Sequence, residues 1–239
     1  MVFEELWNGV TLQCPEGSFP LGTDSLVLAD FAQPIKGGTV CDLGCGTGAI
    51  ALMLLASDPN LSVTGVELQT ELARVAAENA VRNGLQERFT VLQGDLRTVR
   101  ELLPANSFSC VVANPPYFPA DSLPPKEESL AISRTEICCT PEALCTAAAW
   151  LLPTGGKFCL VHKPERLADL ICALRACALE PKRLRFVRHS AASKRSLVLL
   201  EAVRCGRPGL TCADDLILYD PNGALTEEGL RIYHKEVSP

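Results

Sequence analysis

From residue 39 onward the chain alternates short apolar runs with amphipathic segments of helical period. The apolar runs have the length and the β-branched content of strands, and they cover residues 39–43, 61–67, 88–95, 108–114 and 156–162. The segments of helical period run to about Ser57 and over residues 70–84, 141–152 and 165–179. The run at 108–114 is apolar on both faces, as a central strand of a parallel sheet should be.

Two more stretches, at 183–189 and 195–203, look like closing strands. Repeated strand–helix–strand units place successive strands parallel in one sheet, with helices on both of its faces. The pattern therefore predicts a single α/β domain whose doubly wound sheet is mostly parallel and has an antiparallel closing strand.

The same pattern divides the chain into three parts. We expect the sheet and its helices to occupy residues 39–205, and an extension to follow at 206–239. Residues 1–38 are too few for a second domain and should pack on the core.

Two segments fall outside the alternation. Residues 23–31 read as a helix packed against the sheet, with Thr23 or Asp24 as its N-cap. Residues 117–134 hold three prolines, mixed charge and no period. A loop of this length inside a compact domain is more often functional than accidental.

The net charge of −6 is unevenly distributed along the chain. Between Pro153 and Leu210 there are twelve Lys or Arg and four acids, so this segment carries +8 and the rest of the chain −14. Such asymmetry predicts one basic face on an acidic body. The alternative is a solvated surface whose charges are scattered in space.

The twelve cysteines form no CxxC pair, and most of them, such as Cys110 and Cys172, lie within apolar stretches. We interpret them as reduced, buried, small apolar residues, and we expect no metal site. No apolar run reaches the ~18 residues that span a bilayer. The N-terminal residues carry acids early and lack the basic start of a signal peptide. We therefore expect a cytoplasmic protein without membrane contact, while nothing in the sequence indicates its oligomeric state.

A glycine-rich loop, CDLGCGTGAI, follows the first of these strands. At Gly44, Gly46 and Gly48 the backbone can approach a ligand closely, which a Cβ would prevent. The dinucleotide fingerprint has its last glycine one place later. Ala49 is a common substitute there, so the spacing alone leaves a nicotinamide cofactor open.

Acidic residues at three strand ends narrow the choice of ligand. Asp42 precedes the glycines, Glu67 ends the second strand and Asp95 follows the third. The carboxyl ends of neighbouring parallel strands meet at one crevice, where Glu67 could accept hydrogen bonds from ribose hydroxyls. Asp95 could accept from an adenine amino group, and Asp42 would repel a pyrophosphate but suit a cationic amino group. S-adenosylmethionine fits this set, and capping of the following helix is the alternative for Glu67 or Asp95 alone.

The predicted cofactor site also includes neighbours of these residues and two positions from elsewhere in the chain. These further positions are Cys45, Leu68, Leu96, Thr23 and Asn114. For Thr23, simple helix capping is the alternative.

The fourth strand ends in VVANPPYF. Pro115 and Pro116 donate no backbone N–H, so the chain must leave the sheet with Asn114 at the tip. Together with the glycine loop and the three acids, this motif resembles the class I S-adenosylmethionine-dependent methyltransferases, which have a Rossmann-like sheet. NPPY resembles the branch that methylates planar nitrogens such as the adenine N6 amino group. The alternative is a plain Asn-Pro turn.

The resemblance implies a mechanism based on orientation. The Asn114 side-chain oxygen and the Pro115 carbonyl would each accept an N–H of the amine and so free its lone pair, and Pro116 would hold that carbonyl outward. Tyr117 and Phe118 can stack on the base. No strong general base is required, because the proton leaves readily once the nitrogen is cationic.

NPPY occurs with more than one substrate. The glutamine side chain of a protein such as a release factor is a second planar amide, methylated at N5. The enzymes that act on it are similar in NPPY but carry an additional N-terminal helical domain, which residues 1–38 cannot supply. Guanine N2 of ribosomal RNA is a third substrate. Outside catalysis, an inactive fold that binds RNA or a partner is the alternative.

Four stretches sharpen the choice: FPLGTDSLVLADF (19–31), SRTE (133–136), KRSLVLLEAVRCGRPGL (194–210) and ILYDPNGALTEEGLRIY (217–233). Together they resemble the bacterial tRNA adenine-N6 methyltransferase family, which acts on the adenosine next to the anticodon of a valine tRNA. The resemblance spans nearly the whole chain and implies a tRNA substrate. SRTE differs from the family pattern, because Thr135 stands where histidine is expected.

A tRNA substrate has negatively charged phosphates, which basic residues of the protein would bind. An anticodon-loop base can be splayed out without opening a duplex, and the basic stretch 182–195 could hold phosphates. We expect Arg188, Lys194, Arg195 and Arg134 to contact RNA. The alternatives are a strand edge that uses Lys and Arg against aggregation and, for Arg134, an ion pair with a neighbouring acid.

Overall fold

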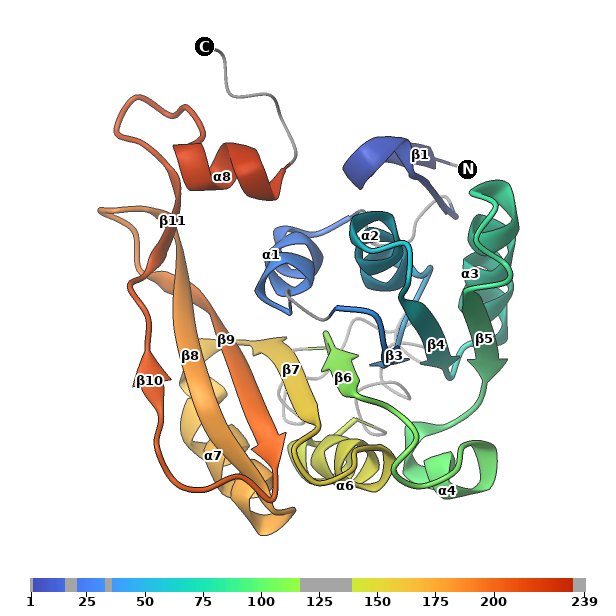
Figure 1. Ribbon diagram of the computed structural model, residues 1–239. Coiled ribbons are helices and arrows are strands. Elements are labelled where there is room, and N and C mark those ends of the chain that lie inside the picture. The colour runs from blue at the N-terminus through green and yellow to red at the C-terminus, as the bar shows by residue number, and fades with distance from the viewer. Residues whose placement is uncertain (1, 16–20, 33–35, 117–138, 234–239) are drawn as a thin grey trace, which may run out of the picture.

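The computed structural model describes residues 2–15, 21–32, 36–116 and 139–233. In this part of the chain nine strands form one sheet in the order β10-β8-β9-β7-β6-β3-β4-β5, and β11 also pairs with β8 (Figure 1). The strands are β3 (Thr39–Leu43), β4 (Ser62–Glu67), β5 (Phe89–Gln93), β6 (Cys110–Ala113), β7 (Lys157–His162), β8 (Leu179–Ser190), β9 (Arg195–Arg204), β10 (Thr211–Cys212) and β11 (Leu216–Tyr219).

Strands β3 to β7 are parallel to one another, and β9 is antiparallel to both β7 and β8. This confirms the predicted mostly parallel sheet with an antiparallel closing strand. Strand β6 lies in the centre, between β3 and β7, and all four of its residues are buried. A strand with neighbours on both edges and helices on both faces has no polar side to present, which explains its apolar sequence.

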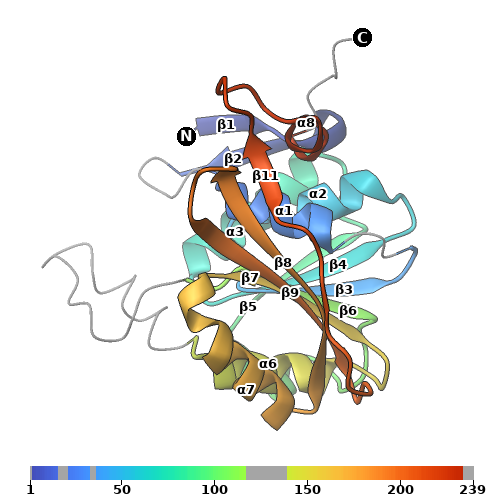
Figure 2. The ribbon, with the colours of Figure 1, turned by 90° about the vertical axis from the view of Figure 1, so that its left-hand side faces the viewer.

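Helices cover both faces of the sheet, as Figures 1 and 2 show. One face carries α1 (Thr23–Phe31), α2 (Ala49–Ser57) and α3 (Thr70–Arg82), and the other carries α4 (Val99–Leu102), α6 (Pro141–Leu151) and α7 (Leu167–Ala176). Each face of the sheet has its own cluster of buried apolar side chains, and successive residues of β3 point to opposite faces. Val40 belongs to one cluster, and Cys41 and Leu43 belong to the other. Within the described residues, no helix is long and apolar enough to cross a bilayer.

The predicted core strands and helices agree with the structure to within about four residues at their ends, and two details are wrong. The helix at 23–31 is confirmed, but its N-cap is Gly22 and not Thr23 or Asp24. The Asp24 carboxylate folds back to accept a hydrogen bond of 2.9 Å from the Ser25 N–H, and a Cβ at Gly22 would lie 2.1 Å from that oxygen. Three cysteines that we interpreted as buried, Cys172, Cys205 and Cys212, are exposed.

Several elements of the two extensions were not predicted. The N-terminal strands β1 (Val2–Glu5) and β2 (Thr11–Cys14) form a separate hairpin around a short 3₁₀ helix, η1 (Trp7–Gly9). In the C-terminal part, β10 and β11 pair with successive parts of β8, and α8 (Glu227–Ile232) follows. The other 3₁₀ helices are η2 (Leu96–Thr98) and η3 (Pro164–Arg166). The division of the chain into a core and two extensions stays a prediction.

Asn79, a fully buried polar residue on α3, ties the N-terminal hairpin to the glycine loop. Its Oδ1 accepts a hydrogen bond from the Gln13 N–H at 2.9 Å, and its Nδ2 donates to the Gln13 carbonyl at 3.0 Å. The same nitrogen donates to the Thr47 carbonyl at 2.9 Å. One amide thus joins β2, α3 and the loop between β3 and α2.

We expect Asn79→Ala to lower the free energy of unfolding by about 2–4 kcal/mol, because a buried polar group left unsatisfied costs about 1–3 kcal/mol. Urea denaturation measures this change. Glu78→Ala on the exposed face of α3, where Glu78 pairs with Arg74, should change stability by less than about 0.5 kcal/mol. Equal effects of the two substitutions would contradict the structural role of the Asn79 amide.

Candidate active site

The predicted site residues meet where the parallel strands end. Asp42 stands near the end of β3, Glu67 is the last residue of β4, and Asn114 directly follows β6. In the sheet Asp42 is paired with both Gly65 of β4 and Val112 of β6. The structure therefore brings the glycine loop, two of the acids and the asparagine to one edge of three adjacent strands.

The glycine loop has the backbone shape that the sequence indicates. Gly44, Gly46 and Gly48 have φ values of +76°, +55° and +90°, which residues with a Cβ rarely adopt. A Cβ at Gly44 or Gly46 would meet no atom within 4 Å. The loop thus offers backbone to an open space, as a site for a closely held ligand requires.

At Gly48 the absence of a side chain allows close packing against Phe89. A Cβ at Gly48 would lie 2.8 Å from Cε1 of Phe89 on β5. Because Gly48 is also the N-cap of α2, its missing side chain lets this helix start close to the sheet. Its predicted contact with a cofactor stays a prediction.

Glu67 is oriented by two backbone donors. Its Oε2 accepts a hydrogen bond of 2.9 Å from the Gly46 N–H, and its Oε1 accepts one of 2.8 Å from the Gln69 N–H. The side chain is buried, and this burial raises its pKa even though both bonds favour the charged form. Each carboxylate oxygen has more than one acceptor position, so Glu67 can still accept hydrogen bonds from a ligand.

Asp42 is a buried carboxylate with little compensation. It is fully buried, and neither oxygen has a hydrogen bond of good geometry within the described part of the chain. Burial, and secondly the charge of Glu67, raise its pKa to about 7, and the backbone N–H of Ala51 opposes this rise only in part. Buried polar groups are almost always paired, so an unpaired carboxylate beside an open glycine loop indicates a site for a ligand that carries a donor or a positive charge.

The Asp95 carboxylate binds a neighbouring residue, Arg97. It caps η2 by accepting a hydrogen bond of 2.8 Å from the Arg97 N–H, and it forms an ion pair of 2.6 Å with the Arg97 guanidinium. The hydrogen bonds from Arg97 lower its pKa. Helix capping, the alternative considered above, therefore applies to Asp95, while its contact with an adenine amino group stays a prediction. Leu96, beside it, lines a small open cavity between η2 and α6.

Asn114 leaves the sheet as the two prolines require, and Pro115 is buried behind it. The Asn114 amide nitrogen donates a hydrogen bond of 3.1 Å to Ser25 Oγ on α1. Sequence reasoning did not identify Ser25, because it lies 89 residues earlier and has no motif of its own. Three predicted cofactor residues remain. Cys45 is buried, whereas Leu68 and Thr23 are half-buried.

The predicted RNA contacts are only partly described. Tyr117, Phe118 and Arg134 lie outside the described residues. Arg188 and Arg195 share one carboxylate, that of Asp215 on the C-terminal part of the chain, at 3.7 and 3.0 Å.

The basic stretch as a whole is less positive than its sequence indicates. Lys194 is exposed at the turn between β8 and β9. Arg183 pairs with Glu201 at 3.0 Å, and Arg185 pairs with Glu228 at 2.6 and 2.8 Å. Every arginine of this stretch therefore has an acidic partner, and two of the acids, Asp215 and Glu228, come from beyond the segment that the charge count covered. Among the described residues, no group of three or more His, Cys, Asp or Glu side chains could hold a metal ion.

Comparisons with known proteins agree with this geometry. Residues 20–172 match the family model of the methyltransferase small domain. A protein of Yersinia enterocolitica named tRNA1(Val) (adenine(37)-N6)-methyltransferase is 34% identical over 142 residues, which cover 59% of this chain and 56% of the relative. A Porphyromonas gingivalis protein of the same name is 29% identical over 224 residues, which cover 89% of this chain and 86% of the relative. The chain thus spans little more than half of the Yersinia relative.

A solved structure shows the same fold. A protein from Agrobacterium tumefaciens, described as a predicted O-methyltransferase, superposes with a TM-score of 0.74 at 21% identity. The superposition covers 89% of this chain and 96% of that protein.

The raised pKa of Asp42 predicts an unusual dependence of stability on pH. A carboxyl whose pKa rises from 3.8 to about 7 on folding stabilises the fold fully below pH 3.8, and this contribution is lost as the pH rises to about 7. We expect Asp42→Asn to raise the free energy of unfolding at pH 8 by about 1–3 kcal/mol and to change it little at pH 4. Thermal denaturation at both pH values measures the difference.

Asp58→Asn is the matched control, because hydrogen bonds from the Gly37 and Asn60 N–H groups lower the pKa of Asp58. Its carboxylate contributes stability above its usual pKa, so this substitution should lower the stability at pH 8. A fall in stability at pH 8 for Asp42→Asn as well would contradict the interpretation of Asp42.

Proposed function

Since the chain belongs to the methyltransferase small domain family, we propose that it transfers the methyl group of S-adenosylmethionine to N6 of an adenosine next to the anticodon of a tRNA. The observation that carries the proposal is the meeting of an open glycine loop, a poorly compensated buried carboxylate and the NPP turn at one sheet edge. The names of the Yersinia and Porphyromonas relatives support the choice of substrate. A tRNA substrate would place the protein in the cytoplasm.

The residues around the glycine loop fit the cofactor. The backbone at Gly44 and Gly46 leaves room for close approach, and Glu67, held by two N–H groups, can accept hydrogen bonds from ribose hydroxyls. Asp42 would gain its missing counter-charge from a cationic ligand. When bound, S-adenosylmethionine supplies an electrophilic methyl group on a positively charged sulfur.

Asn114 and Pro115 would hold the amine that receives the methyl group. The Asn114 side-chain oxygen and the Pro115 carbonyl are acceptors on a turn that Pro116 stiffens. Two acceptors on one N–H₂ group orient its lone pair, and such positioning can supply roughly 7–11 kcal/mol toward a transfer reaction. Tyr117 and Phe118 would stack on the base, and Arg134 would contact the RNA nearby.

The turn between β8 and β9 is well placed for the RNA backbone. Strand β7 ends at His162, which pairs with Val198, and β9 begins three residues before Val198 at Arg195. The two long strands therefore extend past the carboxyl edge on which Asn114 lies. Arg188 and Arg195 share the single charge of Asp215, so these three residues and Lys194 together carry a net charge of +2 that could attract phosphates.

We expect Asn114→Ala to lower the rate of N6-methyladenosine formation at least 100-fold, because the amine loses one of its two acceptors. Nucleoside mass spectrometry of tRNA incubated with the enzyme and S-adenosylmethionine measures the product. Asn60→Ala, at an exposed position of the loop before β4, is the control. Methylation of glutamine in a release factor, with none in tRNA, would overturn the proposed substrate.

We expect Lys194→Ala to weaken tRNA binding and to reduce the slope of log Kd against log salt concentration by about 1, as for the loss of one phosphate contact. Filter binding at four salt concentrations gives this slope. Lys36→Ala, at an exposed position before β3, should leave it unchanged. An unaltered slope for Lys194→Ala would place the RNA on another face.

A further inference from the structure

The Asn114 side chain is held by a residue of the N-terminal helix. Its amide nitrogen donates a hydrogen bond of 3.1 Å to Ser25 Oγ, and both side chains are partly buried. Ser25 lies in the first turn of α1, outside the strands and loops that form the rest of the site. This bond joins α1 directly to the residue that directly follows β6.

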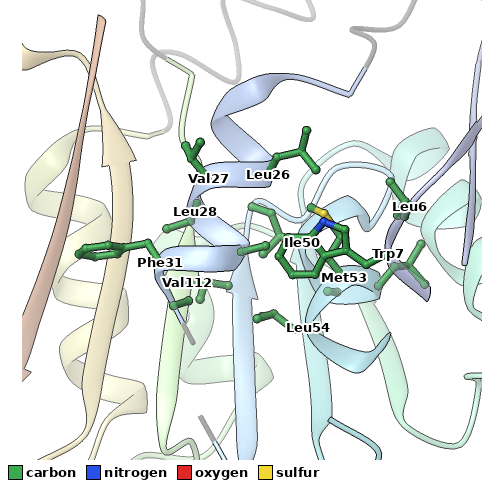
Figure 3. Packing of buried hydrophobic residues seen from close by; sticks show 14 of the residues in the cluster. Leu6, Trp7, Leu26, Val27, Leu28, Phe31, Ile50, Met53, Leu54 and Val112 are labelled. Carbon is green, nitrogen blue, oxygen red and sulfur yellow. The ribbon is translucent and has the colours of Figure 1, made fainter. Parts of the chain in front are cut away.

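Helix α1 is fixed on the sheet by its apolar residues. Val27, Leu28 and Ala29 are fully or almost fully buried. Figure 3 shows Leu28 and Phe31 of α1 close to Val112 of β6, and the three residues belong to one cluster. Because Val112 is two residues before Asn114 on the same chain, packing sets the distance between Ser25 and Asn114.

The C-terminal part of the chain secures both ends of α1. At its start, the Thr23 hydroxyl is hydrogen-bonded to the Tyr233 hydroxyl at 2.8 Å. Near its end, Asp30 forms two hydrogen bonds with Arg231 of α8, one of them at 3.0 Å. These contacts explain why two distant stretches of the sequence belong together: α8 and Tyr233 hold the helix that holds Asn114.

The bond to Ser25 matters because the two ends of an amide have the same shape and opposite chemistry. The oxygen accepts hydrogen bonds and the nitrogen donates them, and rotation about the last side-chain bond of asparagine is soft. The N–H groups of the substrate amine are donors, so they need the acceptor oxygen, which makes the amine nitrogen more nucleophilic. If the Asn114 nitrogen faced the amine instead, N–H donors would face N–H donors.

We propose that Ser25 is a positioning residue for the reaction: by accepting the Asn114 amide N–H, its hydroxyl holds the Asn114 oxygen toward the substrate amine. This rests on the proposed function, because it assigns a role to a group that supports the acceptor. The proposed role of Ser25 acts through Asn114 and requires no contact of Ser25 with the substrate.

Kinetics of Ser25→Ala on tRNA test the proposal. We expect kcat to fall about 3- to 10-fold, the effect of one ordinary hydrogen bond, while KM for tRNA, Kd for S-adenosylmethionine and Tm stay as in the unchanged protein. Ser25→Thr keeps a hydroxyl at this position and should restore kcat. In an Asn114→Ala background, Ser25→Ala should have no further effect. An unchanged kcat, or the same loss in both backgrounds, would overturn the proposal.

A second measurement does not depend on activity. In ¹⁵N-labelled protein the side-chain amide protons of Asn114 should exchange with solvent several-fold faster in Ser25→Ala than in the unchanged chain, and Ser25→Thr should reverse the change. If no RNA is methylated but the exchange responds in this way, the proposed function fails while the contact stands. If exchange does not respond, the positioning role fails whatever the activity.

Discussion

Two carboxylates buried beside each other, those of Asp42 and Glu67, constrain the whole site. The Glu67 carboxylate accepts hydrogen bonds from the N–H groups of Gly46 and Gln69, whereas neither Asp42 oxygen has a bond of such geometry in the described structure. Removal from water raises the pKa of both carboxyl groups, and the charge of Glu67 raises that of Asp42 further. The glycine loop adopts its shape under the same constraint, because the Gly46 N–H faces Glu67 only with the backbone in a conformation that suits glycine. In the proposed reaction, a positively charged ligand would supply the counter-charge that Asp42 lacks.

The core of the fold could be predicted because its elements are long and strongly periodic. Strand β3 and helix α1 have the predicted bounds. By contrast, β10 has two residues and β1 has mostly exposed side chains, so tertiary pairing, and not local sequence, decides their structure. In the site, the glycines and acids carry local signals at strand ends, whereas the contact of Ser25 with Asn114 joins two segments through packing alone. The basic face was overestimated for the same reason, since Asp215 and Glu228 reach the arginines only in the folded chain.

The family model ends at residue 172. Strands β8 and β9, the basic turn between them and α8 all follow that point. The predicted cofactor residues lie before it. In the proposed function, the matched part would therefore bind the methyl donor, and the C-terminal part would face the RNA. Through α8 and Tyr233 the C-terminal part also contacts α1.

Strands β10 and β11 have a consequence for work with shortened forms of the protein. Together they occupy successive stretches of one side of the twelve-residue strand β8. A fragment that stops after β9 would leave that side with unpaired N–H and C=O groups, a ready template for another copy of the chain. It would also lack Asp215 and Glu228 and so present bare guanidinium groups along the same strand. Self-association and indiscriminate attraction to polyanions would then dominate its behaviour, so residues 206–233 belong in any minimal catalytic unit.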